Sequence, residues 1–594
     1  MTYEDHPTVR PHPVIQIALT LIAIIAATSG SLRAAELDPA LKAYLDRCEP
    51  DYSDQVHMLG NRFSSPGYHT TVSSGTWVHR TLDSLDYAEG LLQRGGDADV
   101  QRARQIIAKV LSLQDARPTS PTRGIWPWLL EEPLAKMSPP DFNWADFCGG
   151  RLAQMLVDHR RLLPGELQKS MRNSLRLAGQ AIVRRNVGPD YTNIAIAGGG
   201  VCAAAGELLR DQELLEYGRQ RLQKLVEYTA AQGSFNEYNS PAYTMVALCE
   251  CERTLHLVHD PATRQAAESL RRTAWQITAD SFHPGTQQWA GPHSRAYYDY
   301  LLPQVTEYIS RATGVAIQPH PRAGGATRAV ALTLPNALPC PAELCGRFRA
   351  LPQVPLELRR TFIRGRSDLV ATIGTTWLDA EVCLGSVNRS TFWTQRRPLI
   401  GYWKTDADPA VVFRLRFLHD ERDFASMGGV TAQSGPRALT VFTVWPNQGD
   451  WHPQLDRPKD GLFPASDLRI RYELAGRGVT ADPVGEGRCA LRAGGYRVVI
   501  HTIPSLFDGQ KVVWQISRSE NRAFLDGICY HGSKRSFDFR KLGEVKITVG
   551  VEILRTDQPP AKHWPQLTVN RPGLVEAAWD AGEKPEEKLH VHAP

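Results

Sequence analysis

Residues 100–111 read VQRARQIIAKVL, in which apolar side chains recur every three or four residues. That spacing gives an α-helix one continuous apolar face. Similar stretches cover roughly 145–161, 166–185, 193–210, 211–231, 241–258, 262–281 and 295–312. The segment from about 37 to 312 therefore predicts nine or ten helices joined by short turns. Helix pairs in series form either an open solenoid or a closed toroid, and the lack of a fixed short repeat argues against a standard solenoid.

The hydrophobic pattern changes after about residue 325, where several prolines mark a linker. Residues 413–417 (FRLRF) and 468–474 (LRIRYEL) alternate apolar and polar side chains, as half-buried strands do. Further strand-like runs lie at 439–445, 496–503, 511–516 and 545–554. Strands at this density, with no helices between them, predict an antiparallel β-sandwich.

The predicted fold class is thus multidomain α and β. We expect an (α/α) toroid, an incomplete barrel of helical hairpins, over residues 36–325. An antiparallel β-sandwich should follow over 326–570, and then a polar C-terminal tail over 571–594. Residues 1–35 are predicted to be a signal peptide, because Val14–Ala27 is almost wholly apolar and small residues follow it.

The apolar run at 14–27 is short for a membrane span, although an uncleaved anchor is the alternative. We therefore expect an exported protein, periplasmic or secreted, with no stable membrane partner after signal cleavage. The 594 residues carry a net charge of +5 from 68 basic and 63 acidic groups. That balance argues against a nucleic-acid partner and is compatible with an acidic substrate. The ten cysteines are scattered and no paired CxxC or HExxH occurs, so no structural or protease-type zinc site is expected; the oligomeric state stays open.

The most informative segment for chemistry is 233–243, GSFNEYNSPAY. A glycine turn leads to Asn239 or Ser240 as helix N-cap and to Pro241 at the first helical position. Tyr243 then lies in the first turn, where the helix dipole would stabilise a tyrosinate. The alternative is that Tyr243 only packs against a neighbouring helix.

Two further segments repeat this turn-then-helix arrangement. Residues 186–196, NVGPDYTNIAI, place Tyr191 and Asn193 at the start of an apolar helix, where Asn193 either receives an anion or simply caps. Residues 289–300, WAGPHSRAYYDY, place His293 and Arg295 before a predicted helix that holds Tyr297. Arginine binds carboxylates in a bidentate manner and histidine can relay a proton, but structural roles for both are the alternative.

Earlier segments are typical of the walls of a sugar-binding groove. They hold Trp126 and Trp128 in GIWPWLLEE (124–132), Asn143 in PPDFNWADF (139–147) and His69 in GYHTTV (67–72). Flat rings stack on pyranose faces while amides and carboxylates bind hydroxyls. The alternative is a tryptophan-rich core, which for Trp144 is the better interpretation.

With these segments identified, the chain resembles the polysaccharide lyases of the heparinase II/III, alginate lyase and chondroitin lyase superfamily. The resemblance rests on the toroid-plus-sandwich order and on the pattern G-S-F-x-E-x-x-S-x-x-Y at 233–243. It implies that Tyr243 is the catalytic base, that Asn193 neutralises the substrate carboxylate, and that His293 and Arg295 assist. The superfamily's Asn-His pair is absent, because Ile194 follows Asn193.

The resemblance further implies β-elimination on an anionic, uronic-acid-containing polysaccharide, without a cofactor. The residues predicted to contact the substrate are Trp126, Trp128, Asn143, Tyr191, Glu237, Asn239, Tyr297 and His69.

Two other functions remain open at this stage. A glycoside hydrolase on an α/α toroid would need two carboxylates roughly 5–10 Å apart, such as Asp141 or Asp146 with Glu237. A non-catalytic glycan-binding protein would use the aromatic segments as binding platforms.

Overall fold

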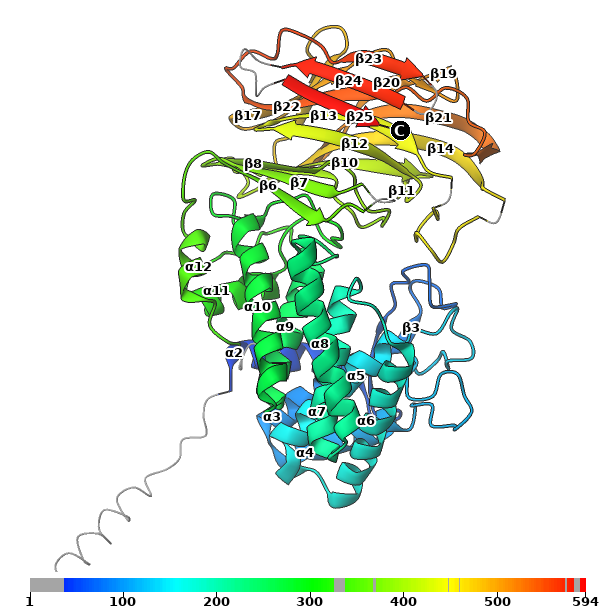
Figure 1. Cartoon of the computed structure of the whole chain (residues 1–594), viewed down its shortest axis with the longest axis vertical. Helices are drawn as coiled ribbons and strands as arrows, with labels where there is room; N and C mark the ends of the chain where they lie inside the picture. The colour runs from blue at the N-terminus through cyan, green and yellow to red at the C-terminus, as the bar shows by residue number, and fades with distance from the viewer. Residues whose placement is uncertain are drawn as a thin grey trace, which may run out of the picture.

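The structure is a computed structural model that describes residues 37–324, 337–366, 370–446, 448–458, 460–571, 574–581 and 588–593. The predicted signal peptide lies outside the described residues. A helical domain and a β-rich domain are stacked along the long axis of the molecule (Figure 1). The predicted order, helices first and antiparallel sheets second, is confirmed.

The helical domain is built from hairpins of helices. Its helices are α2 (Pro39–Cys48), α3 (Thr81–Arg94), α4 (Asp97–Leu111), α5 (Asn143–Asp158), α6 (Gly165–Arg185), α7 (Thr192–Leu209), α8 (Gln212–Gln232), α9 (Pro241–Leu257), α10 (Pro261–Ser281) and α11 (Pro303–Thr313). Helices α3, α5, α7 and α9 contact one another in succession, and so do α4, α6, α8 and α10. Two concentric rows of helices therefore form the arc of an incomplete toroid. A small sheet of β1 (Tyr52–Ser53), β2 (Met58–Arg62) and β3 (Trp77–His79) packs against α3.

Helix α7 lies at the centre of the arc. It is apolar and long enough to cross a membrane, but 83% of it is buried inside the protein, as in a core helix. Its run of glycines lets neighbouring helices approach closely. A Cβ on Gly199 would lie 2.9 Å from Leu222 of α8, and one on Gly200 would collide with Thr254 of α9. The small residues of α7 thus allow the inner and outer rows to pack together.

The predicted helix at 295–312 is wrong in its first half, because α11 begins only at Pro303. The residue before a proline is biased away from the helical region. The backbone also finds other partners here, since Ser294 N–H donates to the carbonyl of Tyr238 and Ala296 N–H to that of Gln395. His293, Arg295 and Tyr297 therefore lie on an extended segment and not on a helix. The short hairpin of β4 (Phe282–His283) and β5 (Gln288–Trp289) precedes it.

The β-rich domain consists of antiparallel sheets, as predicted. Over the described residues the larger sheet has nine strands: β6 (Leu356–Ile363), β7 (Thr372–Leu378), β8 (Val382–Val387), β9 (Leu399–Trp403), β10 (Val411–His419), β11 (Arg422–Asp423), β14 (Leu462–Ala475), β20 (Val513–Ser519) and β21 (Arg522–Asp538). The second sheet contains β12 (Met427–Ser434), β13 (Arg437–Val444), β15 (Thr480–Pro483), β16 (Arg488–Ala493), β17 (Tyr496–Thr502) and β22 (Thr548–Arg555). A hairpin of β18 (Leu506–Phe507) and β19 (Gln510–Lys511) and the short helix α12 (Ala342–Cys345) complete these elements.

The C-terminal segment differs from the predicted polar tail. Strands β23 (Gln566–Arg571), β24 (Leu574–Asp580) and β25 (Lys588–Ala593) form a third antiparallel sheet against β12 and β13 (Figure 1). Trp579, Leu589 and Val591 pack there with Leu439 and Val441 of β13. In β25 the polar residues Lys588, His590 and His592 alternate with apolar ones, which is the pattern of a half-buried strand within a polar segment.

Charged residues are buried within the inner row of helices. Arg151 of α5 donates to Asp86 of α3 at 2.9 Å and to Glu250 of α9 at 3.1 Å. Arg253 also donates to Glu250, at 3.1 Å. Burial raises the pKa of nearby Glu89 to about 7. Arg151 therefore joins three inner helices through buried ion pairs.

We predict that Arg151→Met lowers the free energy of unfolding by about 3–5 kcal/mol, because it leaves the Asp86 carboxylate buried without its cation and leaves Glu250 with Arg253 alone. Lys42→Met is the matched control, since Lys42 forms an exposed ion pair with Asp46, and it should change stability by less than about 1 kcal/mol. Urea unfolding followed by circular dichroism measures both. Equal effects of the two substitutions would contradict a structural role for the buried pairs.

Candidate active site

The N-termini of α5, α7 and α9 lie close together, on the side of the helical domain that meets the β-sandwich. At α9, Ser240 is the N-cap, because its hydroxyl accepts the backbone N–H of Tyr243 at 3.1 Å. At α5 and α7, the Asn143 amide donates to the Tyr191 hydroxyl at 3.0 Å. Helix N-termini carry partial positive charge, so this end of the arc favours an anion.

Tyr243 and Tyr297 form a hydroxyl pair at this end of the arc. Their hydroxyl oxygens are 2.5 Å apart, and Arg295 donates to the Tyr297 hydroxyl at 3.0 Å. The Arg295 guanidinium also lies over the Tyr243 ring, 4.3 Å from its centroid. Tyr297 is 54% exposed and Tyr243 is half-buried, so the pair is open to solvent above a buried cation. We call these two residues the tyrosine pair.

Glu237 connects the tyrosine pair to the start of α7. One carboxylate oxygen accepts from Arg295 at 3.2 Å, and the other accepts the backbone N–H of Asn193 at 3.4 Å. The side-chain oxygen of Asn193 is buried and has no hydrogen-bond partner. Glu237 thus neutralises the charge of Arg295 and connects it to Asn193. The side-chain oxygen of Asn193 keeps its hydrogen-bonding capacity unused.

The β-sandwich domain contributes residues to the same site that the sequence analysis did not identify. The Trp393 ring lies 3.9 Å from the Arg295 guanidinium, and the Gln395 side chain accepts from it at 3.2 Å. Both residues belong to the segment FWTQRR (392–397), in which a tryptophan three residues before a pair of arginines was the available signal. This segment lies about 100 residues after Arg295 in the chain, so the sequence alone did not indicate that the two are in contact.

A row of aromatic rings extends from Trp393 across the junction of the two domains. The successive ring contacts join Trp393, His452, Tyr68, His69, Trp128 and Trp144, with centroids 4.5 to 5.5 Å apart. All of these rings except that of His452 are partly exposed. We call this set the aromatic row. Its members His69 and Trp128 are among the predicted substrate contacts, and the row offers faces on which sugar rings can stack.

Burial and the charge of Arg295 have opposite effects on the pKa values of Tyr243 and Glu237. Burial raises the pKa of Tyr243 well above its usual value, while the neighbouring Arg295 lowers it. Burial raises the pKa of Glu237, and Arg295 again opposes the shift. The pKa of His452 is lowered to about 4, mainly by burial and secondly by the positive charge of Arg295. Arg295 is therefore the group that favours ionised tyrosine and glutamate here.

Three predicted site residues prove to be packing residues. Trp126 is fully buried in the helical core and its indole donates to the carbonyl of Val110 at 2.9 Å, so it has no face for a sugar. Asn239 is 2% exposed and donates to the carbonyls of Ala290 and Pro292. His293 is 2% exposed, and its Nδ1 donates to the Asn239 carbonyl at 2.8 Å. Burial lowers the His293 pKa to about 4, so the ring is a neutral structural group.

The carboxylates considered for a hydrolase are also placed by the structure. Asp141 accepts from the Trp128 indole at 3.1 Å and from the backbone N–H of Asn143 at 3.0 Å. Asp146 is 2% exposed on α5 and packs against α7, where the absence of a Cβ at Gly198 makes room for it. Burial raises the Asp146 pKa to about 7. Asp146 is thus a neutral core group below that pH and has no surface for a substrate.

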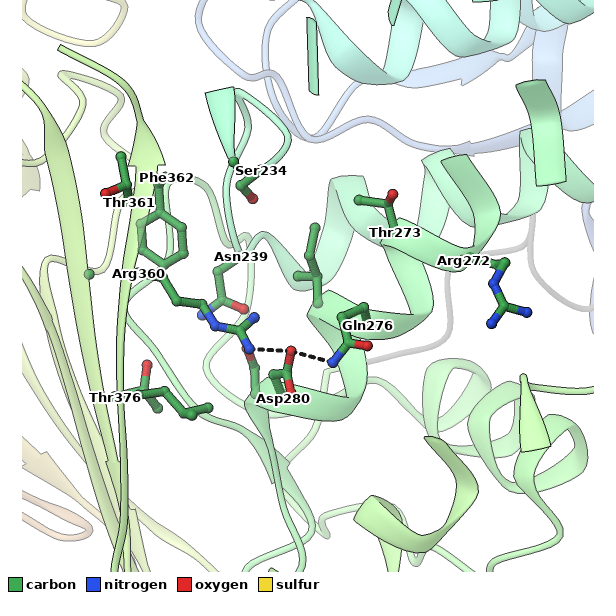
Figure 2. A pocket seen from close by; sticks show the side chains of 15 residues that line it. Ser234, Asn239, Arg272, Thr273, Gln276, Asp280, Arg360, Thr361, Phe362 and Thr376 are labelled. Carbon is green, nitrogen blue, oxygen red and sulfur yellow. Dashed lines mark hydrogen bonds and ion pairs between the residues drawn. The ribbon is translucent and has the colours of Figure 1, made fainter. Parts of the chain in front are cut away.

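A separate cavity of about 650 Å³ is lined by the 233–239 loop together with α10, β6 and β7 (Figure 2). Its ionisable groups are already paired, since Arg360 donates to Asp280, which also accepts from Gln276 at 2.7 Å. It contains neither member of the tyrosine pair. Among the described residues, no group of three His, Cys, Asp or Glu could hold a metal ion.

Comparisons with known proteins add a family match and two similar structures. A family model described as a domain of unknown function (DUF8769) matches residues 52–313, most of the helical domain. No curated protein matches the sequence. A crystal structure of heparinase III is similar with a TM-score of 0.43 and 10% identity, over 95% of this chain and 92% of that one. A heparinase III structure with methylated lysines has a TM-score of 0.37 and 8% identity, over 95% and 91% of the two chains.

We predict that Asp146→Asn stabilises the protein in a pH-dependent manner. Between the ordinary pKa of 3.8 and the folded value of about 7, the unfolded chain loses a proton that the native state keeps. Native stability therefore falls as pH rises through this window, by up to about 1.4 kcal/mol per unit, and the asparagine removes that loss. Urea unfolding of both proteins at pH 5, 6, 7 and 8 should show a growing difference that levels off above pH 7. A difference independent of pH would contradict it.

Proposed function

We propose that this protein is a polysaccharide lyase that cleaves an anionic, uronic-acid-containing glycan by β-elimination. The observation that supports this most directly is the tyrosine pair, bonded at 2.5 Å above the buried Arg295 guanidinium. A lyase needs a base that can reach a carbon-bound proton and positive potential that holds the substrate carboxylate. Tyr243, Arg295 and the N-terminus of α7 at Asn193 provide this combination.

In the proposed reaction, Tyr243 as tyrosinate removes the proton from C5 of the uronate. The positive potential of Arg295 and of the N-terminus of α7 stabilises the negative charge that then develops on the carboxylate. The electron pair forms the C4–C5 double bond while the C4–O bond breaks. Because His293 is buried and bonded to Asn239, we assign the return of a proton to the leaving oxygen to the tyrosine pair.

The aromatic row supports a polymeric substrate. Its rings start beside Arg295 at Trp393 and continue to Trp144, so several sugar units could stack along the domain junction. Such polymers lie outside cells, which agrees with the export that the N-terminal sequence predicts. We therefore propose a periplasmic or secreted location.

A glycoside hydrolase is the second candidate. Asp141 accepts the backbone N–H of Asn143 and Glu237 that of Asn193, so one carboxylate lies at the start of α5 and another at the start of α7. Each already accepts hydrogen bonds from the protein, Asp141 from Trp128 and Glu237 from Arg295. That engagement favours the lyase, in which Glu237 orients other groups and neither transfers a proton nor forms a bond to the substrate.

We predict that Tyr243→Phe lowers the rate on an accepted uronate polymer by at least about 10²–10⁴-fold, because it removes the base and keeps the ring. The rate is measured from the ultraviolet absorbance of the unsaturated uronate product, with circular dichroism as the check on folding. Tyr217→Phe, on the outer helix α8, is the control and should keep its rate. A folded Tyr243→Phe protein with a near-normal rate would exclude Tyr243 as the base.

Glu237→Gln separates the two candidate functions. A hydrolase that uses Glu237 would lose its activity entirely. In the lyase, removal of the Glu237 charge leaves Arg295 uncompensated, and since that charge raises the pKa of Tyr243, its loss favours tyrosinate. We therefore expect residual lyase activity whose rising limb in the pH–rate profile moves to lower pH. A limb that stays in place or moves to higher pH would contradict this coupling.

A further inference from the structure

A cavity of about 350 Å³ follows the inner side of α9 within the arc of helices. Ala242, Val246, Cys249 and Arg253 line it at successive turns of α9, so it extends along about 16 Å of the helix. Phe147 of α5 and Tyr298 also line it. We call this space the axial cavity.

The walls of the axial cavity are mostly apolar, and the charges at its inner end are already compensated. Arg151 is paired with Asp86 and Glu250, and Arg253 with Glu250. An ionic ligand would have to break these buried pairs, which is costly. The cavity therefore suits an uncharged apolar group and not a second carboxylate or sulfate.

The axial cavity begins directly beside the tyrosine pair. Tyr297 lines its mouth and at the same time bonds the Tyr243 hydroxyl at 2.5 Å, and Ala242 precedes Tyr243 in the chain. A group in the cavity would thus be continuous with a sugar unit placed at the tyrosine pair. Three aromatic rings, those of Phe147, Tyr297 and Tyr298, face this space and favour a flat aromatic occupant.

We propose that the axial cavity binds an uncharged aryl substituent carried by the glycan substrate, such as a phenolic ester or ether. This inference rests on the proposed function and names a feature of the substrate class. An engineered apolar cavity of about 150 Å³ holds benzene, so a space of about 350 Å³ accommodates a ring system of naphthyl size.

The test uses 1-naphthol as probe in calorimetric titrations of the whole protein at two temperatures. We expect saturable binding with a negative heat-capacity change, as burial of apolar surface requires. Val246→Phe fills the cavity and should weaken binding at least tenfold. Val157→Phe, on the exposed face of α5, adds the same ring elsewhere and should leave binding within twofold. Cys249→Phe fills the next turn and replaces Val246→Phe if that variant does not fold.

The outcomes separate this inference from the proposed function. Naphthol binding that is lost in the filled variants supports the cavity even if no uronate polymer is cleaved, which would refute only the lyase. Cleavage of a uronate polymer without saturable naphthol binding would overturn the aryl site and leave the lyase standing. Equal binding by wild type and Val246→Phe would also overturn it, because the probe would then lie elsewhere.

Discussion

The site depends on one backbone pairing between the two domains. His293 and Arg397 exchange both of their backbone hydrogen bonds, at 3.0 and 2.9 Å, and Ala296 N–H donates to the Gln395 carbonyl. This short antiparallel contact draws residues 293–297 away from a helix and along the edge of the sandwich. Arg295 consequently contacts Tyr243 from the helical domain and Trp393 from the other. Neither domain alone could assemble this arrangement.

Arg295 is the electrostatic centre of that arrangement. It is 4% exposed and interacts with Glu237, Gln395 and Tyr297 at once. A buried cation without such partners would strongly destabilise the folded protein. The contacts of Arg295 are therefore needed to keep its charge buried at the site. The same burial that raises the pKa of Tyr243 strengthens the opposing effect of Arg295, which links the stability of the site to its chemistry.

The inner row of helices carries two different groups of polar residues, one at the end that faces the sandwich and one farther from it. At its sandwich-facing end, helix N-termini surround the tyrosine pair and favour an anion. Deeper in the arc, Arg151 joins α3, α5 and α9 through compensated charges. The axial cavity lies between these two levels, apolar because the charges below it are neutralised and the hydroxyls above it are bonded to each other. One arc of helices thus presents a polar region and an apolar region directly beside each other.

Local sequence was sufficient for what depends on near neighbours. The 3.6-residue and two-residue periods predicted the helices and sheets, and the segment 233–243 predicted the capped start of α9 with Tyr243 in its first turn. The pairing of Arg295 with Trp393 and Gln395, and the burial of His293, Asn239 and Trp126, depend on contacts between segments far apart in the chain. The same holds for the C-terminal sheet, whose apolar residues are buried only because the sheet packs against β12 and β13. Periodicity and capping are properties of a short stretch, whereas burial and charge compensation exist only once distant segments have packed together.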